Sequence, residues 1–175
     1  MRLFTGLDLS IATLDQFLSA LRPAAPNLQW SPLKNLHITT KFIGEWPEPR
    51  LGELTQVLQG IQKPGLLRIH MRGVGWFPDP HQPRYLFAAV EASQQLLDLA
   101  RDTQNALAVI GVKVEDRAYT PHVTLARVRA AELAALQQAI AEYGSLDFGM
   151  VEAKSFALYV SVMSVYTKLA EFPLQ

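Results

Sequence analysis

The chain contains an internal repeat, which limits the architectures open to it more strongly than any single motif. Residues 3–8 resemble residues 86–91, because each segment is a short apolar run that ends in an acidic side chain. Such a run is typical of a buried strand that leads into a helix. In both halves an amphipathic helical pattern follows, then a strand pattern and a second helical pattern. A last strand pattern ends each half, over residues 67–75 and 151–161.

We expect one domain over residues 1–175, built from repeat units of about 1–83 and 84–175. The order strand, helix, strand, helix, strand, used twice, predicts an α+β fold with two pseudo-symmetric lobes. Each lobe is expected to be an antiparallel sheet flanked by helices, and the two lobes to enclose a central cleft. A single doubly wound sheet is the alternative. The bilobal fold is favoured because no glycine-rich turn joins the first strand to the first helix.

Each repeat unit carries the same polar signature, His-x-Thr, in its second strand. His37 and Thr39 form the first pair, and His122 and Thr124 form the second. Side chains two residues apart in a strand point to the same side, so each histidine shares a face with its threonine. Pseudo-symmetry sets the two strands facing one another across the cleft. The sequence therefore predicts one site with two imidazoles and two hydroxyls.

Two imidazoles on opposite sides of a bound group can divide the proton transfers of a reaction. An imidazole has a pKa of about 6.5, so one ring can accept a proton at neutral pH while the other donates one. The hydroxyls of Thr39 and Thr124 can hold non-bridging phosphate oxygens. This set of groups predicts phosphodiester chemistry with His37 and His122 as the acid–base pair.

Two cations are candidates for the same phosphate site. Strict alternation places Lys41 on the face that carries His37 and Thr39. Arg127 falls on the opposite face of its strand from His122, so it reaches the cleft only past the end of the strand or through a β-bulge. We expect both side chains to bind substrate phosphate.

Composition excludes several other chemistries. The chain has no cysteine, which rules out disulfides, thiolate catalysis and cysteine-ligated metal sites. His37 and His122 lack the nearby acidic side chains that would complete a catalytic zinc site, so neither a metal nor another cofactor is expected. The remaining histidines, His70 and His81, have no recurring partner in the sequence and are expected on the surface.

The charge balance and the hydropathy pattern bear on partners and location. Sixteen basic residues balance sixteen acidic ones, so no overall field draws the chain to nucleic acid or to an anionic membrane. No apolar stretch reaches the roughly 18 to 20 residues that span a bilayer, and the N-terminus lacks the pattern of a secretory signal. We therefore expect a cytoplasmic protein.

The flanks of both motifs resemble those of a known family. Residues 35–45, 73–78 and 121–127, together with Arg2-Leu3-Phe4 and Leu7-Asp8, are similar to the 2H phosphoesterases. Within that superfamily the similarity is to the bacterial and archaeal RNA 2′,3′-cyclic phosphodiesterases, also called 2′-5′ RNA ligases. The resemblance runs nearly from end to end and includes two intact HxTx motifs.

This resemblance implies an activity and a role for each candidate residue. His37 is implied to be the proton donor and His122 the proton acceptor, an order that the residues alone do not give. The implied reaction is attack of water on a terminal 2′,3′-cyclic phosphate, which leaves a 2′-phosphate. A reversible, nucleotide-independent joining of RNA ends through a 2′-5′ bond is also implied. The family's lobes combine segments from both chain ends. The phosphate-binding residues are implied to be Thr39, Thr124, Lys41 and Arg127.

One segment departs from the family pattern. Family members commonly carry a Pro- and Gly-containing loop between a Ser and a Tyr near the C-terminus, whereas Ser161 and Tyr166 are close neighbours here. We therefore expect a different rim to the cleft, with consequences for substrate length and base preference.

The expected partners are RNA ends or oligonucleotides that bear a 2′,3′-cyclic phosphate, bound by a monomer without a membrane. Two alternatives stay open. One is a phosphodiesterase of small cyclic phosphates or 2′-5′ oligonucleotides, which the neutral net charge permits. The other is a non-catalytic module that recognises RNA ends, although binding alone would not need two matched proton carriers.

Overall fold

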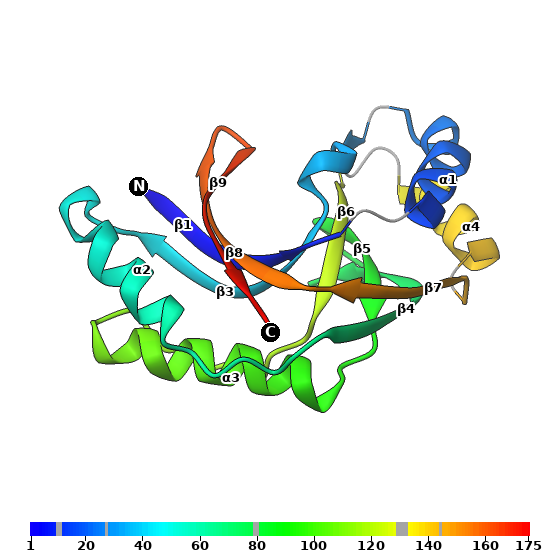
Figure 1. Ribbon diagram of the computed structural model, residues 1–175. Helices are drawn as coiled ribbons and strands as arrows, with labels where there is room; N and C mark the ends of the chain where they lie inside the picture. Colours follow the sequence, from blue (N-terminus) through cyan, green and yellow to red (C-terminus); the bar gives the residue numbers. More distant parts are fainter. Residues whose placement is uncertain (10–11, 27, 79–80, 129–132, 144) are drawn as a thin grey trace.

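The computed structural model describes residues 1–9, 12–26, 28–78, 81–128, 133–143 and 145–175. They form an α+β structure of antiparallel strands and four α-helices (Figure 1), which confirms the predicted fold class. The strands are β1 (Arg2–Asp8), β2 (Gln29–Trp30), β3 (His37–Glu45), β4 (Leu67–Phe77), β5 (Tyr85–Val90), β6 (His122–Arg127), β7 (Asp147–Ala153), β8 (Ser155–Val162) and β9 (Val165–Pro173). The helices are α1 (Ala12–Leu21), α2 (Leu51–Gln59), α3 (Gln94–Val109) and α4 (Leu133–Tyr143).

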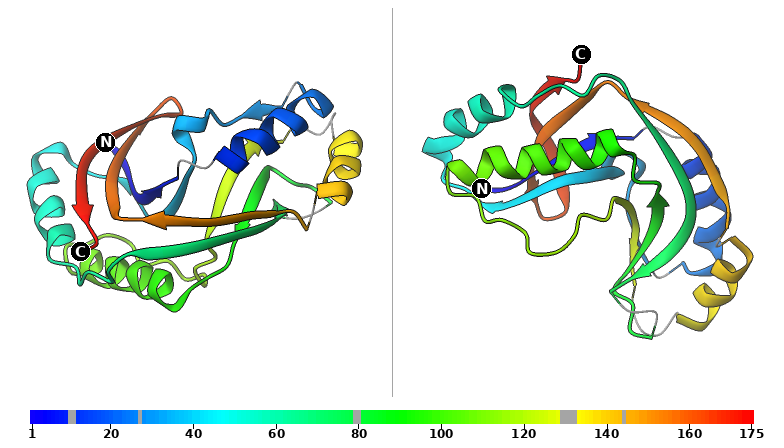
Figure 2. Two further views of the ribbon diagram at one scale, coloured as in Figure 1. Left: turned by 45° about the vertical axis from the view of Figure 1, so that its right-hand side comes forward. Right: turned by 90° about the horizontal axis from the view of Figure 1, so that it is seen from below.

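The strands form one sheet in the order β7-β4-β5-β6-β3-β1-β8-β9, with β2 paired to β6. In the described part of the chain, β3 and β6 are joined by a single residue pair, Ile38 with Val123. On one side of this junction lie β3, β1, β8 and β9, here called the first lobe. On the other side lie β6, β5, β4 and β7, here called the second lobe. The sheet bends strongly between the lobes, as Figure 2 shows.

The helices are exchanged between the lobes. Helix α1 follows β1 of the first lobe but packs against β7 of the second, beside α4, which packs on β4. Helix α3 follows β5 of the second lobe but packs on β3 of the first, beside α2 (Figure 1). Each lobe therefore combines segments from both halves of the sequence. None of the helices in the described ranges is both long and apolar enough to cross a membrane.

Helix α3 illustrates why these residues form these elements. The Ser93 hydroxyl accepts a hydrogen bond from the Leu96 amide at 3.2 Å, and so caps the first turn. Leu96, Leu99 and Leu107 are buried on the face that meets the sheet. Gly111, with φ of +96°, follows the end of the helix in the left-handed region that favours glycine.

The last strand of the second repeat unit differs from the prediction. Residues 151–161 were expected to form one strand, but the chain divides at Lys154 into β7 and β8. Strand β7 pairs with β4 in the second lobe, whereas β8 pairs with β1 in the first. A single apolar run cannot reveal that its two ends serve different lobes.

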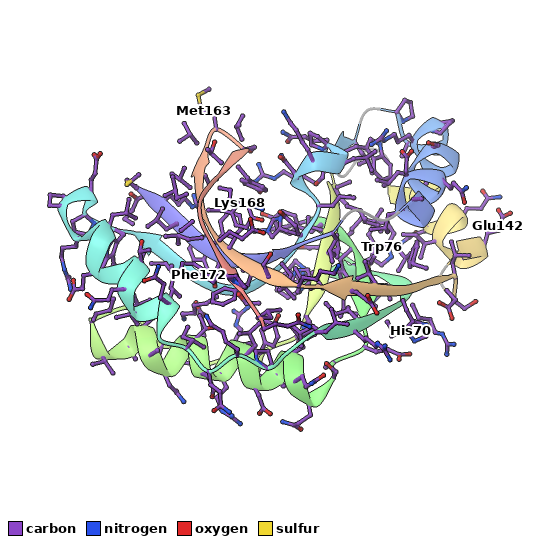
Figure 3. The ribbon with its side chains drawn as sticks, viewed as in Figure 1. His70, Trp76, Glu142, Met163, Lys168 and Phe172 are labelled. Atoms are coloured by element: carbon purple, nitrogen blue, oxygen red, sulfur yellow. The ribbon has the colours of Figure 1, made fainter. Side chains whose placement is uncertain are left out.

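Strand β9 was not predicted, because most of its side chains are exposed and its apolar alternation is weak. It pairs with β8 through the short connection between Ser161 and Tyr166. The two residues at the turn, Met163 and Ser164, have φ of 48° and 64°, as a two-residue hairpin requires. Met163 projects away from the molecule at this tip (Figure 3).

The structure also corrects the alignment of the two repeat units. Asp8 pairs with His37, whereas Ala89 pairs with His122. Residues 4–8 of β1 therefore correspond to residues 85–89 of β5, two positions away from the match that the apolar runs suggest. In particular, Glu91 is not the counterpart of Asp8.

Candidate active site

Four polar side chains surround the junction of the two lobes. Strands β3 and β6 are antiparallel at the Ile38–Val123 pair, so position 37 faces position 124 and position 39 faces position 122. Ile38 and Val123 are fully buried on the core side of the sheet. The structure thus brings His37, Thr39, His122 and Thr124 together on the opposite face.

The two imidazoles are oriented in the same way. His37 Nδ1 lies 2.7 Å from the Asn35 carbonyl oxygen, and His122 Nδ1 lies 2.9 Å from the Thr120 carbonyl oxygen. A carbonyl oxygen can only accept, so Nδ1 carries the hydrogen in both rings. This leaves Nε2 of each ring to exchange protons with a bound group. In His37, Nε2 lies 3.0 Å from Thr39 Oγ1.

The His37 ring sits in a packed aromatic environment. The centroids of the Phe4 and Tyr166 rings lie 4.7 and 5.2 Å from that of His37. A Cβ at Gly6 would lie 2.9 Å from the Ile38 carbonyl oxygen and 3.3 Å from the His37 ring. Glycine is therefore required there to let β1 approach the histidine closely.

The His122 ring is more exposed. It makes an edge-on contact with Phe87, and the two ring centroids lie 5.6 Å apart. The two imidazoles also differ in their charged surroundings. Burial lowers the pKa of His37, and the Asn35 hydrogen bond and the Asp8 carboxylate partly oppose that effect. Burial by itself would raise the pKa of Asp8, but hydrogen bonds from Lys168 and Tyr159 hold it below its ordinary value.

A β-bulge occurs at the same place in each His-x-Thr strand. Thr40 has no partner in β1, because Thr5 pairs with Lys41 and Gly6 pairs with Thr39. Leu125 is skipped in the same way between β6 and β5. A bulge reverses the alternation of side chains beyond it.

In β6 the bulge moves Arg127 onto the face of His122 and Thr124, one of the two routes that the sequence left open. Arg127 pairs with Tyr85, and its guanidinium carbon lies 5.7 Å from the centroid of that ring. Tyr85 and Thr124 line a recess of about 150 Å³ next to His122.

In β3 the bulge turns Lys41 off the face of His37 and Thr39, so the expected shared face is wrong, although Lys41 still lines the cleft that begins at Thr39. The Lys41 side chain is 3% exposed. Its ammonium donates to the Lys113 carbonyl oxygen at 2.8 Å and to Gln104 Oε1 at 3.2 Å, and it pairs with Glu115 at 3.7 Å. Lys41 thus links β3 to α3 and to the segment after it. Burial lowers the pKa of Lys41, and Glu115 opposes that effect.

A cleft of about 620 Å³ begins at Thr39 and His122 and continues along α3. Four aromatic side chains line it, Phe42, Phe77, Phe87 and Tyr119, and the first two are 42% and 46% exposed. Two arginines, Arg101 and Arg117, also line this cleft. Such exposed rings and a cation suit a nucleotide better than an inorganic anion.

Sequence reasoning missed these wall residues. Phe42 occupies the position in β3 that Arg127 occupies in β6, so the shared His-x-Thr-x-x spacing was a usable signal. Tyr119 gave no signal, because it follows an irregular segment. Its hydroxyl donates to the Thr39 carbonyl oxygen at 2.9 Å, and burial raises its pKa above the ordinary value.

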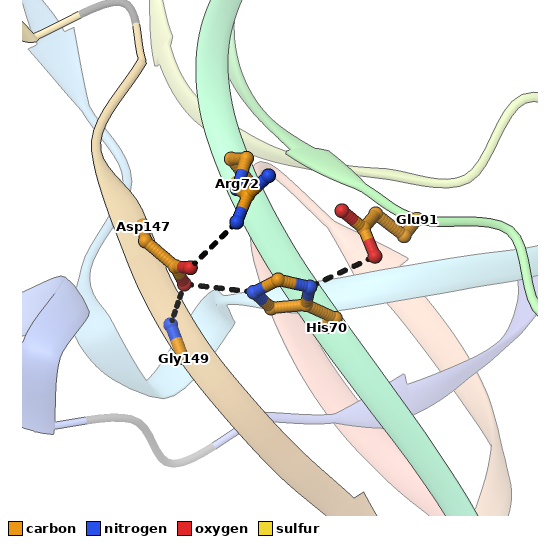
Figure 4. A network of polar contacts seen from close by, with 5 residues as sticks. All are labelled: His70, Arg72, Glu91, Asp147 and Gly149. Carbon is orange, nitrogen blue, oxygen red and sulfur yellow. Dashed lines mark hydrogen bonds and ion pairs between the residues drawn. The ribbon is translucent and has the colours of Figure 1, made fainter.

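His70 lies away from the junction in a polar network on the second lobe (Figure 4). Its Nδ1 lies 2.8 Å from Glu91 Oε2, and its Nε2 lies 2.8 Å from Asp147 Oδ1. Asp147 also pairs with Arg72 and accepts from the Gly149 amide. Because ionised carboxylates only accept, these hydrogen bonds favour the protonated ring and raise the pKa of His70. Neither this network nor any other part of the described chain groups three His, Cys, Asp or Glu side chains that could hold a metal ion.

Known proteins share both the sequence and the fold. The model of the 2′-5′ RNA ligase superfamily matches residues 11–162. The chain is 37% identical over 133 residues to the RNA 2′,3′-cyclic phosphodiesterase of Aeropyrum pernix, covering 75% of each chain. It is 31% identical over 153 residues to that of Aquifex aeolicus, covering 83% of this chain and 81% of the relative. The crystal structure of TT0787 of Thermus thermophilus superposes with a TM-score of 0.80 at 28% identity, covering 99% of this chain and 98% of that one.

Proposed function

This chain belongs to the 2′-5′ RNA ligase superfamily, and we propose that it is an RNA 2′,3′-cyclic phosphodiesterase that converts a terminal 2′,3′-cyclic phosphate into a 2′-phosphate. The observation that carries the proposal is the arrangement around the Ile38–Val123 pair. Two imidazoles with the same orientation and two hydroxyls meet there on one face of the sheet.

The reaction needs one proton removed and one proton supplied. Water attacks phosphorus, and His122 Nε2 takes a proton from that water as the new P–O bond forms. The bond between phosphorus and the ribose 3′ oxygen breaks, and His37 gives its proton to that oxygen. The phosphate stays on the 2′ oxygen. Such general acid–base steps contribute roughly 10²- to 10⁴-fold each to the rate.

The exposure of the two rings supports this order. His122 is exposed and can meet the attacking water, whereas His37 is half-buried beside Asp8. A bound phosphate brings a second negative charge to His37, which favours its protonated form in the complex.

Two hydroxyls and one guanidinium are assigned to the phosphate. Thr39 and Thr124 occupy the diagonal positions between the imidazoles and can donate to the non-bridging oxygens. Arg127 is the cation on this face, and it stabilises the charge that grows on those oxygens. Lys41 is assigned a structural role instead, because its ammonium is already bound.

The cleft supports an RNA end rather than a small cyclic phosphate as substrate. The cleft of about 620 Å³ extends beyond Thr39 and His122. It is lined in part by Phe42, Phe77 and Phe87, on which bases can stack. The same site would join RNA ends through a 2′-5′ bond when a ribose hydroxyl takes the place of the water. Dinucleotides and tRNA-length RNAs with the same cyclic end compare the two substrate classes directly.

Turnover of a cyclic-phosphate-ended oligonucleotide in the presence of EDTA tests this function. We expect activity to persist under chelation, because the two imidazoles perform the proton transfers. Phosphorus NMR should show a 2′-phosphate on the product. A 3′-phosphate would overturn the assignment of the leaving oxygen, and binding without turnover would favour the non-catalytic alternative.

A further inference from the structure

The two histidines occupy equivalent places in the fold but face different partners in the neighbouring strand. His37 lies opposite Asp8 of β1, and His122 lies opposite Ala89 of β5. The strand registers are otherwise the same, including the skipped residues Thr40 and Leu125. The pseudo-symmetry of the site is therefore broken by one carboxylate.

Asp8 is held firmly in place by two other strands. The Tyr159 hydroxyl of β8 donates to Asp8 Oδ1, and Lys168 Nζ of β9 lies 2.7 Å from Asp8 Oδ2. Lys168 belongs to the β8–β9 hairpin and is labelled in Figure 3. Both carboxylate oxygens are thus occupied, and the imidazole receives the field of Asp8 without a direct hydrogen bond. Its own nitrogens bind Asn35 and Thr39.

The titratable groups that face His37 come from four strands. Asp8 lies on β1, Tyr159 on β8, Tyr166 on β9 and His122 on β6. Lys168 binds Asp8 and does not contact His37 itself. Its ammonium also lies 3.5 Å from Glu171 Oε1. Among these described groups, Asp8 is the carboxylate placed directly across from the ring.

We propose that Asp8 is a positioning residue for catalysis, whose fixed carboxylate keeps a proton on His37 in the substrate complex and so makes His37, not His122, the proton donor. This inference rests on the proposed function, because it assigns the two proton-transfer roles of that reaction. Lys168 moderates the field of Asp8, since it neutralises part of the same carboxylate. Ala89, the residue opposite His122, carries no charge and cannot act on that ring in this way.

The replacement Asp8→Asn keeps the size of the side chain and removes its charge. The basic limb of kcat against pH reports loss of the proton from the donor in the enzyme–substrate complex, which is the state that the proposal concerns. An opposite charge nearby raises a histidine pKa by about one unit or more, so the limb should move to lower pH by about one unit. The rate at pH 8 should fall several-fold more than the rate at pH 6. A purely structural role would lower the rate by one factor at every pH.

Lys168→Met should act in the opposite direction. Removal of the ammonium leaves the Asp8 charge uncompensated while Tyr159 still holds the carboxylate, so the basic limb should move to higher pH. Glu171→Gln is the matched control for Asp8→Asn. Each replacement removes a carboxylate next to Lys168, but Glu171 does not face His37. We expect no movement of either limb there. Ala89→Asp should move the acidic limb to higher pH, because it places a carboxylate opposite His122 and so raises the pKa of that ring.

NMR titration of the His37 ring separates this inference from the proposed function, since it needs no turnover. The His37 pKa should fall in Asp8→Asn and rise in Lys168→Met. If the wild-type protein lacks cyclic phosphodiesterase activity while these shifts occur, the proposed function fails and the electrostatic link stands. If the enzyme is active but neither the titration nor the basic limb moves in Asp8→Asn, the role of Asp8 is wrong.

Discussion

Ile38 of β3 is paired with Val123 of β6, and the two lobes share their sheet through this contact. Both side chains are fully buried, so the pair fixes the junction from the core side. On the other face the neighbours of this pair are the four polar residues of the candidate site. The distance between the two imidazoles is therefore set by one backbone contact and by the packing beneath it.

Replacing either His37 or His122 by Ala should lower kcat roughly a hundredfold or more, because a positioned acid or base contributes at least that much. Initial rates on a cyclic-phosphate-ended oligonucleotide measure the loss. His81→Gln is the control, since His81 lies in the loop between β4 and β5, and it should leave the rate unchanged. Wild-type rates in either alanine variant would remove the paired-imidazole mechanism.

Thr39→Val and Thr124→Val should separate phosphate binding from proton transfer. Valine keeps the β-branched shape and removes the hydroxyl donor, so turnover should slow roughly ten- to a thousandfold while the strand persists. The pH optimum should hardly move, because a hydroxyl does not titrate in this range. Full activity in both variants would contradict the assigned arrangement.

Arg127→Met and Lys41→Met should have different effects, although both remove one cation. Arg127→Met should raise KM and flatten its dependence on salt, because a cation–phosphate contact is screened by ions. Lys41→Met should lower the melting temperature, because it leaves the Lys113 carbonyl oxygen without its donor at a part-buried site and Gln104 Oε1 with the Glu115 amide alone. That loss corresponds to about 1–3 kcal/mol. A salt-dependent KM effect at Lys41 with unchanged stability would reverse this assignment.

Gly6→Ala should disturb the site through the backbone. The new Cβ would lie 2.9 Å from the Ile38 carbonyl oxygen, so β1 and β3 must separate, at a cost of roughly 1–3 kcal/mol. His37 should shift with β3, and kcat should fall along with the melting temperature. Gly52→Ala is a suitable control, because an added Cβ in α2 meets no atom within 4 Å. Equal stability of the two variants would show that the close approach at Gly6 is not required.

The His70 network should make stability depend on pH. Hydrogen bonds to Asp147 and Glu91 raise the pKa of His70, so its contribution is complete below about pH 6.5 and is lost as pH rises through the raised value. The Gly149 amide and His70 lower the pKa of Asp147 to about 2, so that contribution is lost only as pH falls towards this value. The melting temperature of His70→Gln should therefore differ most from wild type between about pH 4 and 6. An equal difference at pH 9 would contradict this account.

Local pattern predicted the elements that carry the site. The two His-x-Thr strands and much of the order of helices and strands follow from side-chain periodicity, which depends on near neighbours in the chain. The bulges at Thr40 and Leu125 could not be predicted in this way. They depend on how β3 and β6 pair with β1 and β5, and neither bulged position carries a glycine as a signal.

Charge placement was harder to predict than element order. Lys41 and Phe42 exchange faces because of one bulged residue, and strict alternation along the strand does not predict that exchange. The acidic ends of the two apolar runs suggested that Asp8 and Glu91 are equivalent. The true alignment of β1 with β5 is two residues away, so the pairing of Asp8 with His37 was not predicted. The partners of His70 also come from strands distant in sequence, so its network was not foreseen.

The exchange of α1 and α3 has a consequence for the integrity of the chain as a whole. If the backbone were cut between residues 83 and 84, each fragment would keep one His-x-Thr strand, yet neither would retain every strand and helix of either lobe. The halves of the sequence are interlocked, so each fragment needs the other to complete its hydrophobic interior. Because each lobe needs both halves of the chain, the arrangement of His37 and His122 should form, and unfold, in one cooperative step.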